Sequence, residues 1–210
     1  MKKIIFVSTG RCGTKRIFEI LKDKSPSFEC IHQNFLSRPA NVIGNLMFVL
    51  GSWELVKQKI YNSIIKKYST KENFVCSDPL TAMILPKKMI MDSNTMIVHI
   101  LRPKREFATS FFKISRRRLK SFIAHNFIPF WQIGILPLEN LLNKKIFYKY
   151  VKLCDIKNEY FVEQYSINPN FKTVTMEEIF KSTFIEDTIN SFFNEGIQIS
   201  KNELFKKSNR

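Results

Sequence analysis

The segment Phe6–Leu21, FVSTGRCGTKRIFEIL, constrains the fold of this chain more than any other stretch. It passes from a run of β-branched and aromatic residues, through a turn that contains Gly10 and Gly13, into apolar residues at helical spacing. A strand, turn and helix in this order direct several backbone N–H groups and the positive end of the helix dipole toward one point. We therefore expect this turn to hold a phosphate or sulfate group.

Further strand patterns alternate with helical patterns along the chain. The expected strands are Lys3–Thr9, Phe28–Gln33, Asn73–Asp78, Thr95–Arg102 and Phe171–Met176. Helices are expected from Thr14, after Pro103, over Lys145–Tyr165, over Glu177–Gly196, and over Val42–Tyr68 as one helix or two broken near Gly51. Glu177 and Glu178 are expected to be capping charges at the start of their helix. This alternation predicts an α/β fold, a three-layer domain with a central, mostly parallel sheet flanked by helices. The length of 210 residues favours one domain, residues 1–210.

The chain is strongly basic, with 34 Lys and Arg against 18 Asp and Glu and a formal net charge of +16. This balance favours an anionic partner, such as a phosphorylated cofactor, a nucleic acid or a membrane surface. Lysine is abundant along the whole sequence, so the charge alone does not choose among these partners. The sequence has no helix-turn-helix, RNA-recognition or zinc-finger signature, and we expect no specific nucleic-acid partner.

Cysteine and apolar residues indicate the class of protein. The four cysteines, Cys12, Cys30, Cys76 and Cys154, are widely spaced, which predicts reduced thiols in a cytoplasmic protein rather than a disulfide scaffold or a zinc site. The run Ile4–Val7 is too short for a signal peptide, so no export is expected. The stretches Val42–Val56 and Phe122–Leu142 are interrupted by polar residues or proline, and we expect core helices or a substrate-covering segment rather than membrane spans.

The first glycine turn does not match the common nucleotide-binding loops. A triphosphate-binding loop needs four residues between its first glycine and a Gly-Lys-Ser/Thr triplet, whereas only two residues separate Gly10 from Gly13. A dinucleotide fingerprint needs Gly-x-Gly-x-x-Gly, which is also absent. Arg11 adds a charged fork and Thr14 a hydroxyl at the helix start, so the turn still suits an anion.

A second anion site is expected in the segment His99–Lys113, HILRPKREFATSFFK. Arg102 ends the expected strand, and Ser110 follows eight residues later, about two helical turns along the next helix. Both sites fall at the carboxyl ends of parallel strands, where open α/β sheets bind ligands. Two anion sites on one edge suggest a cofactor that is phosphorylated at both ends.

These motifs resemble those of the sulfotransferases that use 3′-phosphoadenosine 5′-phosphosulfate (PAPS). STGRCGT resembles their 5′-phosphosulfate loop, and LRPKREFATSF is similar to their 3′-phosphate motif. Weaker similarity continues through Cys76–Pro86 and Val174–Phe180. The resemblance implies a P-loop-like sulfotransferase fold, PAPS as sulfuryl donor, and transfer to an acceptor hydroxyl or amine.

The resemblance also implies a role for individual residues. By this resemblance, the residues expected to bind the cofactor are Arg11, Gly13, Thr14, Lys15, Arg102 and Ser110. Arg11 is expected to stabilise the charge that develops as sulfate leaves, and Arg102 and Ser110 to bind the 3′-phosphate. Lys15 stands where many members carry a second hydroxyl residue, and it would act as a point charge. The family's late Gly-rich lid has no counterpart, so Arg116–Arg118 either substitutes for it or forms a solvated basic face.

The catalytic base is left open between His32, Asp78 and neither. His32 lies in CIHQNF, where similar proteins often show a His-Glu pair and Gln33 replaces the Glu. Asp78 is alternatively a turn or cap residue beside a proline. The other histidines, His99 and His125, are expected to be structural, and we expect no metal because no standard ligand spacing occurs.

Other functions remain compatible with the sequence. They are a nucleotide-dependent phosphoryl transferase, a non-catalytic PAPS-binding module and a basic nucleic-acid-binding protein. The segment Ser121–Leu142, which contains Trp131, is apolar and hints at a lipid-like, aromatic or glycosidic acceptor. A buried helical hairpin or a homodimer contact explains the same composition.

Overall fold

A computed structural model describes residues 1–33, 35–68, 71 and 73–205 of the chain. Five parallel strands form its sheet in the order β2-β3-β1-β4-β5. The strands are β1 (Lys3–Ser8), β2 (Phe28–Ile31), β3 (Asn73–Cys76), β4 (Thr95–Leu101) and β5 (Phe171–Thr175). All five expected strands are confirmed within two residues of their ends, as is the α/β class. The central strands β1, β3 and β4 are buried on both faces along nearly their whole length, whereas the edge strands β2 and β5 are only partly buried.

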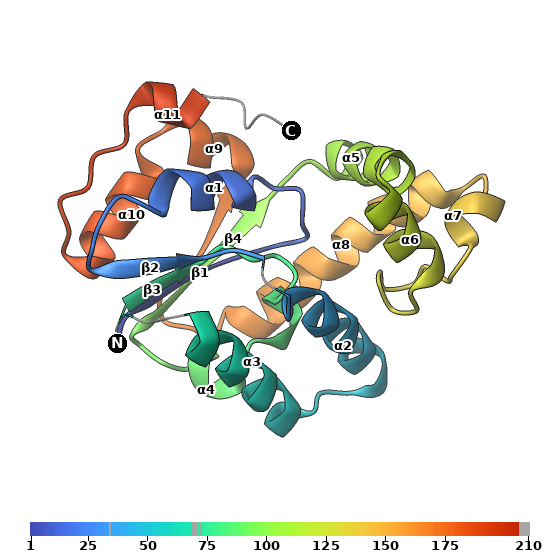
Figure 1. Cartoon of the computed structure of the whole chain (residues 1–210), viewed down its shortest axis with the longest axis horizontal. Helices are drawn as coiled ribbons and strands as arrows, with labels where there is room; N and C mark the ends of the chain where they lie inside the picture. Colours follow the sequence, from blue (N-terminus) through green and yellow to red (C-terminus); the bar gives the residue numbers. More distant parts are fainter. Residues whose placement is uncertain (34, 69–70, 72, 206–210) are drawn as a thin grey trace.

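Helices cover both faces of the sheet (Figure 1). They are α1 (Thr14–Leu21), α2 (Ser37–Leu50), α3 (Glu54–Tyr68), α4 (Lys87–Ile90), α5 (Lys104–Arg117), α6 (Leu119–Phe127), α7 (Glu139–Leu142), α8 (Ile146–Tyr165), α9 (Met176–Lys181), α10 (Phe184–Phe193) and α11 (Lys201–Phe205), with a 3₁₀ turn η1 at Ala82–Ile84. The break near Gly51 is confirmed, because Gly51 adopts a φ of 102° between α2 and α3. Pro103 is the N-cap residue of α5, immediately before the first helical residue, Lys104.

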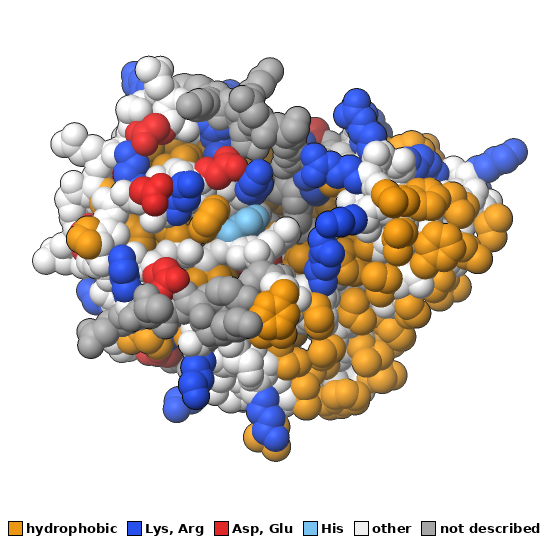
Figure 2. Space-filling model, in the orientation of Figure 1, with side chains coloured by type: hydrophobic (Ala, Val, Ile, Leu, Met, Phe, Trp, Pro, Cys, Tyr) orange, Lys and Arg blue, Asp and Glu red, His pale blue; other side chains and the backbone are white. Residues whose placement is uncertain are grey.

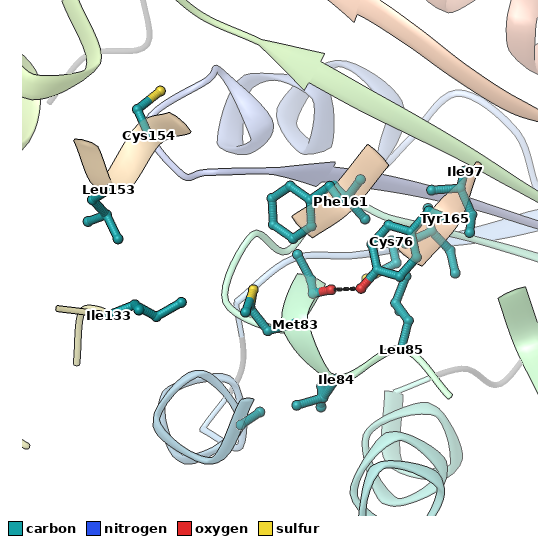
Figure 3. Packing of buried hydrophobic residues seen from close by; sticks show 14 of the residues in the cluster. Cys76, Met83, Ile84, Leu85, Ile97, Ile133, Leu153, Cys154, Phe161 and Tyr165 are labelled. Atoms are coloured by element: carbon teal, nitrogen blue, oxygen red, sulfur yellow. Dashed lines mark hydrogen bonds between the residues drawn. The ribbon is translucent and has the colours of Figure 1, made fainter. Parts of the chain in front are cut away.

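Alternate residues of each strand belong to two separate cores. Ile5 and Val7 of β1 face a core that α2, α3, α5 and α8 cover, whereas Ile4 and Phe6 face a core under α1, α9 and α10. Figure 3 shows the first core, where Phe161 and Tyr165 pack beside η1 and Tyr165 donates a hydrogen bond to the Ala82 carbonyl. This period of two is what a strand buried on both faces requires.

The strand order creates a switch point between β1 and β4. The chain leaves β1 toward β2 on one side of the sheet and leaves β4 toward β5 on the other. The two strands pair in register from Lys3 and Thr95 to Ser8 and Ile100, so they end at the same edge. Because open α/β sheets bind ligands where adjacent connections diverge, the loops after β1 and β4 define the place to look for a site.

The last expected helix, Glu177–Gly196, is two helices. Ser182 takes an extended conformation, and its hydroxyl accepts a hydrogen bond from the Phe184 N–H, which separates α9 from α10. The expected capping role is confirmed for Glu178, which forms a capping box with Thr175.

The apolar segment Ser121–Leu142 is not a buried helical hairpin. It contains the end of α6, an irregular stretch with Pro129 and Pro137, and the four-residue helix α7. Leu136 and Leu142 are more than 70% exposed, at 72% and 79%. In the described part of the chain, no helix is long and apolar enough to cross a membrane.

Candidate functional site

The turn after β1 has the backbone of an anion-binding loop. Gly10, Arg11 and Gly13 all have positive φ, at 94°, 61° and 79°. Gly13 is also the N-cap of α1, and a Cβ at this position would overlap the ring of Phe180. Glycine at position 13 therefore avoids both backbone strain and an overlap with the Phe180 ring.

Polar contacts inside the turn hold it in shape. The Gly10 N–H donates to Ser8 Oγ over 3.2 Å, and the Cys12 thiol donates to the Gly10 carbonyl over 3.2 Å. Burial raises the pKa of Cys12, so the thiol stays protonated and unreactive. Cys12 is fully buried and fills space within the turn.

The structure brings the two basic motifs together. Arg11 Nε donates a hydrogen bond of 3.0 Å to Ser110 Oγ on α5. Arg102 Nη1, at the end of β4, donates one of 2.6 Å to the Arg11 carbonyl. Arg11, Arg102 and Ser110 thus form one cluster at the switch point, although 91 and 99 residues separate Arg11 from the other two.

Arg102 has a carboxylate beside it. Its Nε lies 3.4 Å from Glu106 Oε2, one helical turn along the chain, and its side chain is 19% exposed. The guanidinium has five N–H donors, so the contacts with Glu106 and the Arg11 carbonyl leave donors for an anion. A pocket of 320 Å³ opens beside Arg102, between β4, β5 and α8, with Asn158 and Thr175 in its wall.

The other residues assigned to the loop differ in position. Thr14 is the first residue of α1 and is 4% exposed. Lys15 is half exposed, and its Nζ lies 3.2 Å from Glu19 Oε1 on the same helix. Lys15 therefore does not join the cluster around Arg11, and its ion pair would have to break for it to reach an anion.

His32 lies at the end of β2 with one ring nitrogen occupied. Its Nδ1 is 2.9 Å from the Ser77 carbonyl, which can only accept, so Nδ1 carries the proton and Nε2 is the acceptor in the neutral ring. The ring stacks on Phe18 of α1 with 5.6 Å between centroids. Burial lowers the pKa of His32 below its usual value, which favours the neutral form.

The carboxylate of Asp78 accepts hydrogen bonds that hold the chain in place after β3. Ser37 Oγ donates a hydrogen bond to its Oδ2, and the Leu80 N–H donates to its Oδ1 over 2.9 Å. Asp78 is buried, with 2% of the residue exposed, and this burial raises the pKa of its carboxyl group. These contacts agree with the turn role that the sequence offered for Asp78.

The remaining histidines and Arg116 are held by contacts with neighbouring side chains and carbonyls. His99 Nε2 is 3.0 Å from Asn158 Oδ1 inside the first core, and His125 Nδ1 is 3.1 Å from the Tyr150 hydroxyl. The guanidinium carbon of Arg116 lies 3.8 Å from the centre of the Phe112 ring, and Arg116 Nη2 donates a hydrogen bond to the Asn140 carbonyl. Among the described residues, no group of three or more His, Cys, Asp or Glu side chains is placed to hold a metal.

Sequence reasoning missed three residues of this edge. Phe180 fixes the Gly13 position, Ser77 fixes the tautomer of His32, and Glu106 pairs with Arg102. Only Glu106 had a readable signal, since it follows Arg102 at the i,i+4 spacing of helical ion pairs.

The sequence matches no protein family and no curated protein. Among solved structures, the chain is similar to the "Sulfotransferase Domain from the Curacin Biosynthetic Pathway". The TM-score is 0.48 at 11% sequence identity, and the similarity covers 100% of this chain and 78% of that chain.

Proposed function

We propose that this chain is a sulfotransferase that moves a sulfuryl group from PAPS to an acceptor hydroxyl or amine. The observation that carries the proposal is the hydrogen bond from Arg11 to Ser110, because it joins the residues that resemble the 5′-phosphosulfate and 3′-phosphate motifs into one cationic cluster. The loop with three positive-φ residues and the guanidinium of Arg102 fit a ligand that is anionic at both ends.

The residues divide the chemistry between them. The backbone of the turn at Gly13 and the N-terminus of α1 hold the phosphosulfate end, and Arg102 and Ser110 hold the 3′-phosphate. Arg11 stabilises the negative charge on the phosphate oxygen as the bond between this oxygen and sulfur breaks.

His32 completes the transfer as the general base. Its Nε2 accepts the proton of the acceptor hydroxyl or amine while the new bond from the acceptor to sulfur forms. The Ser77 carbonyl holds the ring in the tautomer that this role needs. PAPS supplies the activated sulfuryl group when it is bound, and the protein supplies charge, orientation and the proton acceptor.

The experiment is transfer of radiolabelled sulfate from PAPS to a panel of phenols, sterols, glycolipids, carbohydrates and amines. We expect a labelled product, and a loss in kcat of at least about 100-fold in Arg11→Ala, the range seen when one transition-state donor is removed. Arg105→Ala, an exposed arginine on α5, is the matched control and should retain activity. Absence of product across the panel, with 3′-phosphoadenosine 5′-phosphate still bound, would favour the non-catalytic module.

A further inference from the structure

An extended apolar surface lies on α6, α7 and the segment between them. We call it the apolar face and define it by its most projecting side chains, which are Leu119, Ile123, Phe127, Leu136, Leu141 and Leu142, between 45% and 79% exposed. Figure 2 shows the hydrophobic area as continuous over α6, α7 and the end of α2. Soluble monomers rarely expose so broad an apolar patch without a partner.

Hydrogen bonds beneath the surface hold this face in one conformation. The Leu138 N–H donates to the Asn126 carbonyl over 2.6 Å, and Asn140 Nδ2 donates to the His125 carbonyl over 3.0 Å. The Tyr150 hydroxyl donates to Asn140 Oδ1 over 2.9 Å, which fixes α7 on α8. The face is therefore a built feature of the fold.

The end of α2 is attached to the same surface. Asn45 Nδ2 donates to the Phe130 carbonyl over 2.8 Å, and Asn41 Nδ2 donates to the Trp131 carbonyl over 3.1 Å. Phe48 and Leu50, at the end of α2, are 38% and 60% exposed. These contacts join segments that are distant in the sequence into a single apolar surface.

The chain around the apolar face is the most basic part of the protein. Residues 107–154 carry nine basic side chains and one acid, Glu139, which gives +8, half of the net charge of +16. Glu139 is 11% exposed and paired with Lys149. The basic residues are Lys113, Arg116, Arg117, Arg118, Lys120, Lys144, Lys145, Lys149 and Lys152. Lys and Arg side chains stand along the border of the apolar area (Figure 2).

We propose that the apolar face docks on the surface of a bilayer that contains anionic lipids. The most exposed apolar side chains of the face, Leu119, Leu136 and Leu142, fit insertion at the level of the acyl chains. The lysines and arginines at the border would then meet the anionic headgroups. Insertion and charge act together, which is the requirement for stable binding at an interface.

Charge favours a membrane over a second copy of the chain. A symmetric dimer through this face would place two regions of +8 against each other, and cores of protein interfaces are depleted in lysine. An anionic bilayer instead neutralises the same charge. The proposal concerns a surface separate from the cluster of Arg11 and Arg102 and does not rest on the proposed activity.

The experiment is co-sedimentation of the full chain with two kinds of vesicle, phosphatidylcholine alone and phosphatidylcholine with about a third phosphatidylglycerol. We expect binding to the anionic vesicles, weaker binding at high salt, and little binding to the neutral ones. Leu136→Ser and Leu142→Ser should each lower the partition coefficient by about 10-fold, since each removes an inserted side chain.

Matched variants outside the face act as controls. Ile167→Ser changes an apolar side chain that is 57% exposed after α8, and Lys88→Gln changes an exposed charge on α4. Both should bind vesicles as the unmodified chain does, whereas Lys120→Gln with Lys144→Gln should bind more weakly at low salt.

The alternatives give different results. A concentration-dependent dimer in analytical ultracentrifugation that Leu142→Ser abolishes, with no vesicle binding, would assign the face to a second copy and overturn the proposal. Equal binding of the Leu136→Ser, Leu142→Ser and control variants to anionic vesicles would overturn it too, because general electrostatic attraction would then explain the binding. Failure of nucleotide binding or sulfuryl transfer would leave all of these results unchanged.

Discussion

Arg11 Nε donates a hydrogen bond of 3.0 Å to Ser110 Oγ, across 99 residues of sequence. The bond links the turn after β1 to the helix after β4, and these are the two connections that diverge at the switch point of the sheet. Arg102 reinforces the link through the Arg11 carbonyl. Two segments that are far apart in the sequence therefore meet at one place in the fold.

Replacement of Arg102 should weaken the binding of a 3′-phosphate. We expect Arg102→Ala to lower the affinity for 3′-phosphoadenosine 5′-phosphate by about 10- to 100-fold, the worth of a charge-assisted hydrogen bond. Arg105→Ala removes the same charge from an exposed position of α5 and should change the affinity by less than about 3-fold. Calorimetric titration of both variants measures these affinities. An equal loss of affinity in the two variants would contradict a specific role of Arg102 in binding the 3′-phosphate.

Gly13→Ala should destabilise the fold through two separate effects. The φ of 79° costs a residue with a Cβ about 1 kcal/mol, and the overlap with Phe180 adds a further cost of about 1–3 kcal/mol. Gly134→Ala, at a φ of 70° with no described atom within 4 Å of the new Cβ, is the control for backbone strain alone.

Denaturant unfolding separates the two contributions. In a Phe180→Leu background, Gly13→Ala should cost less than it does in the unmodified chain, because the ring that it meets is gone. Additive losses in the double variant would mean that Phe180 does not determine the need for glycine.

The pKa of His32 should lie below the usual value for histidine, and the neutral ring should carry its proton on Nδ1. Burial lowers its pKa, and the negative charge of Asp78 opposes that effect. Asp78→Asn should therefore lower the pKa of His32 further. Nitrogen NMR of the imidazole reports both the tautomer and the pKa, and a ring protonated on Nε2 in the neutral state would rule out His32 as the base.

The fold should lose stability on mild acidification because of His125. Burial, and then the positive charge of Lys157, lower its pKa to about 4 in the folded state. The unfolded chain thus binds the proton more readily than the folded one does. The contribution of neutral His125 to the free energy of unfolding is therefore complete above the pKa that histidine has in the unfolded chain. It is lost progressively as the pH falls from about 6.5 toward 4.

The size of this effect is measurable. Between pH 7 and pH 5, His125 should remove about 2 kcal/mol from the free energy of unfolding. In His125→Asn this dependence should be smaller by about that amount, as measured by urea unfolding at both pH values. An unchanged slope would place the acid sensitivity on other groups.

The strands could be predicted because each one corresponds to a short, continuous pattern of residues in the sequence. β1 and β4 are rich in Ile and Val and are buried on both faces. The glycines of the first turn indicate positive φ angles, which glycine adopts more readily than other residues. The short polar interruption at Ser182 was missed, since it resembles the residues of an exposed helix face and acts only through its hydroxyl.

The tertiary contacts of the site could not be predicted in the same way. Nothing near Gly13 in the sequence points to Phe180, and nothing near His32 points to the Ser77 carbonyl. Composition left the role of Ser121–Leu142 undecided, because its apolar residues fit an acceptor-covering segment, a buried hairpin or a dimer contact. Hydrophobicity records the tendency to leave water and does not identify the surface that covers the side chain.

The most direct test of the central claim is calorimetric titration of the purified chain with 3′-phosphoadenosine 5′-phosphate, adenosine 5′-phosphate and ATP. A site in which Arg102 and Ser110 hold a 3′-phosphate predicts that 3′-phosphoadenosine 5′-phosphate binds at least about 100-fold more tightly than the nucleotide without the 3′-phosphate. Equal affinities, or a preference for ATP, would contradict the assignment of this cluster to PAPS.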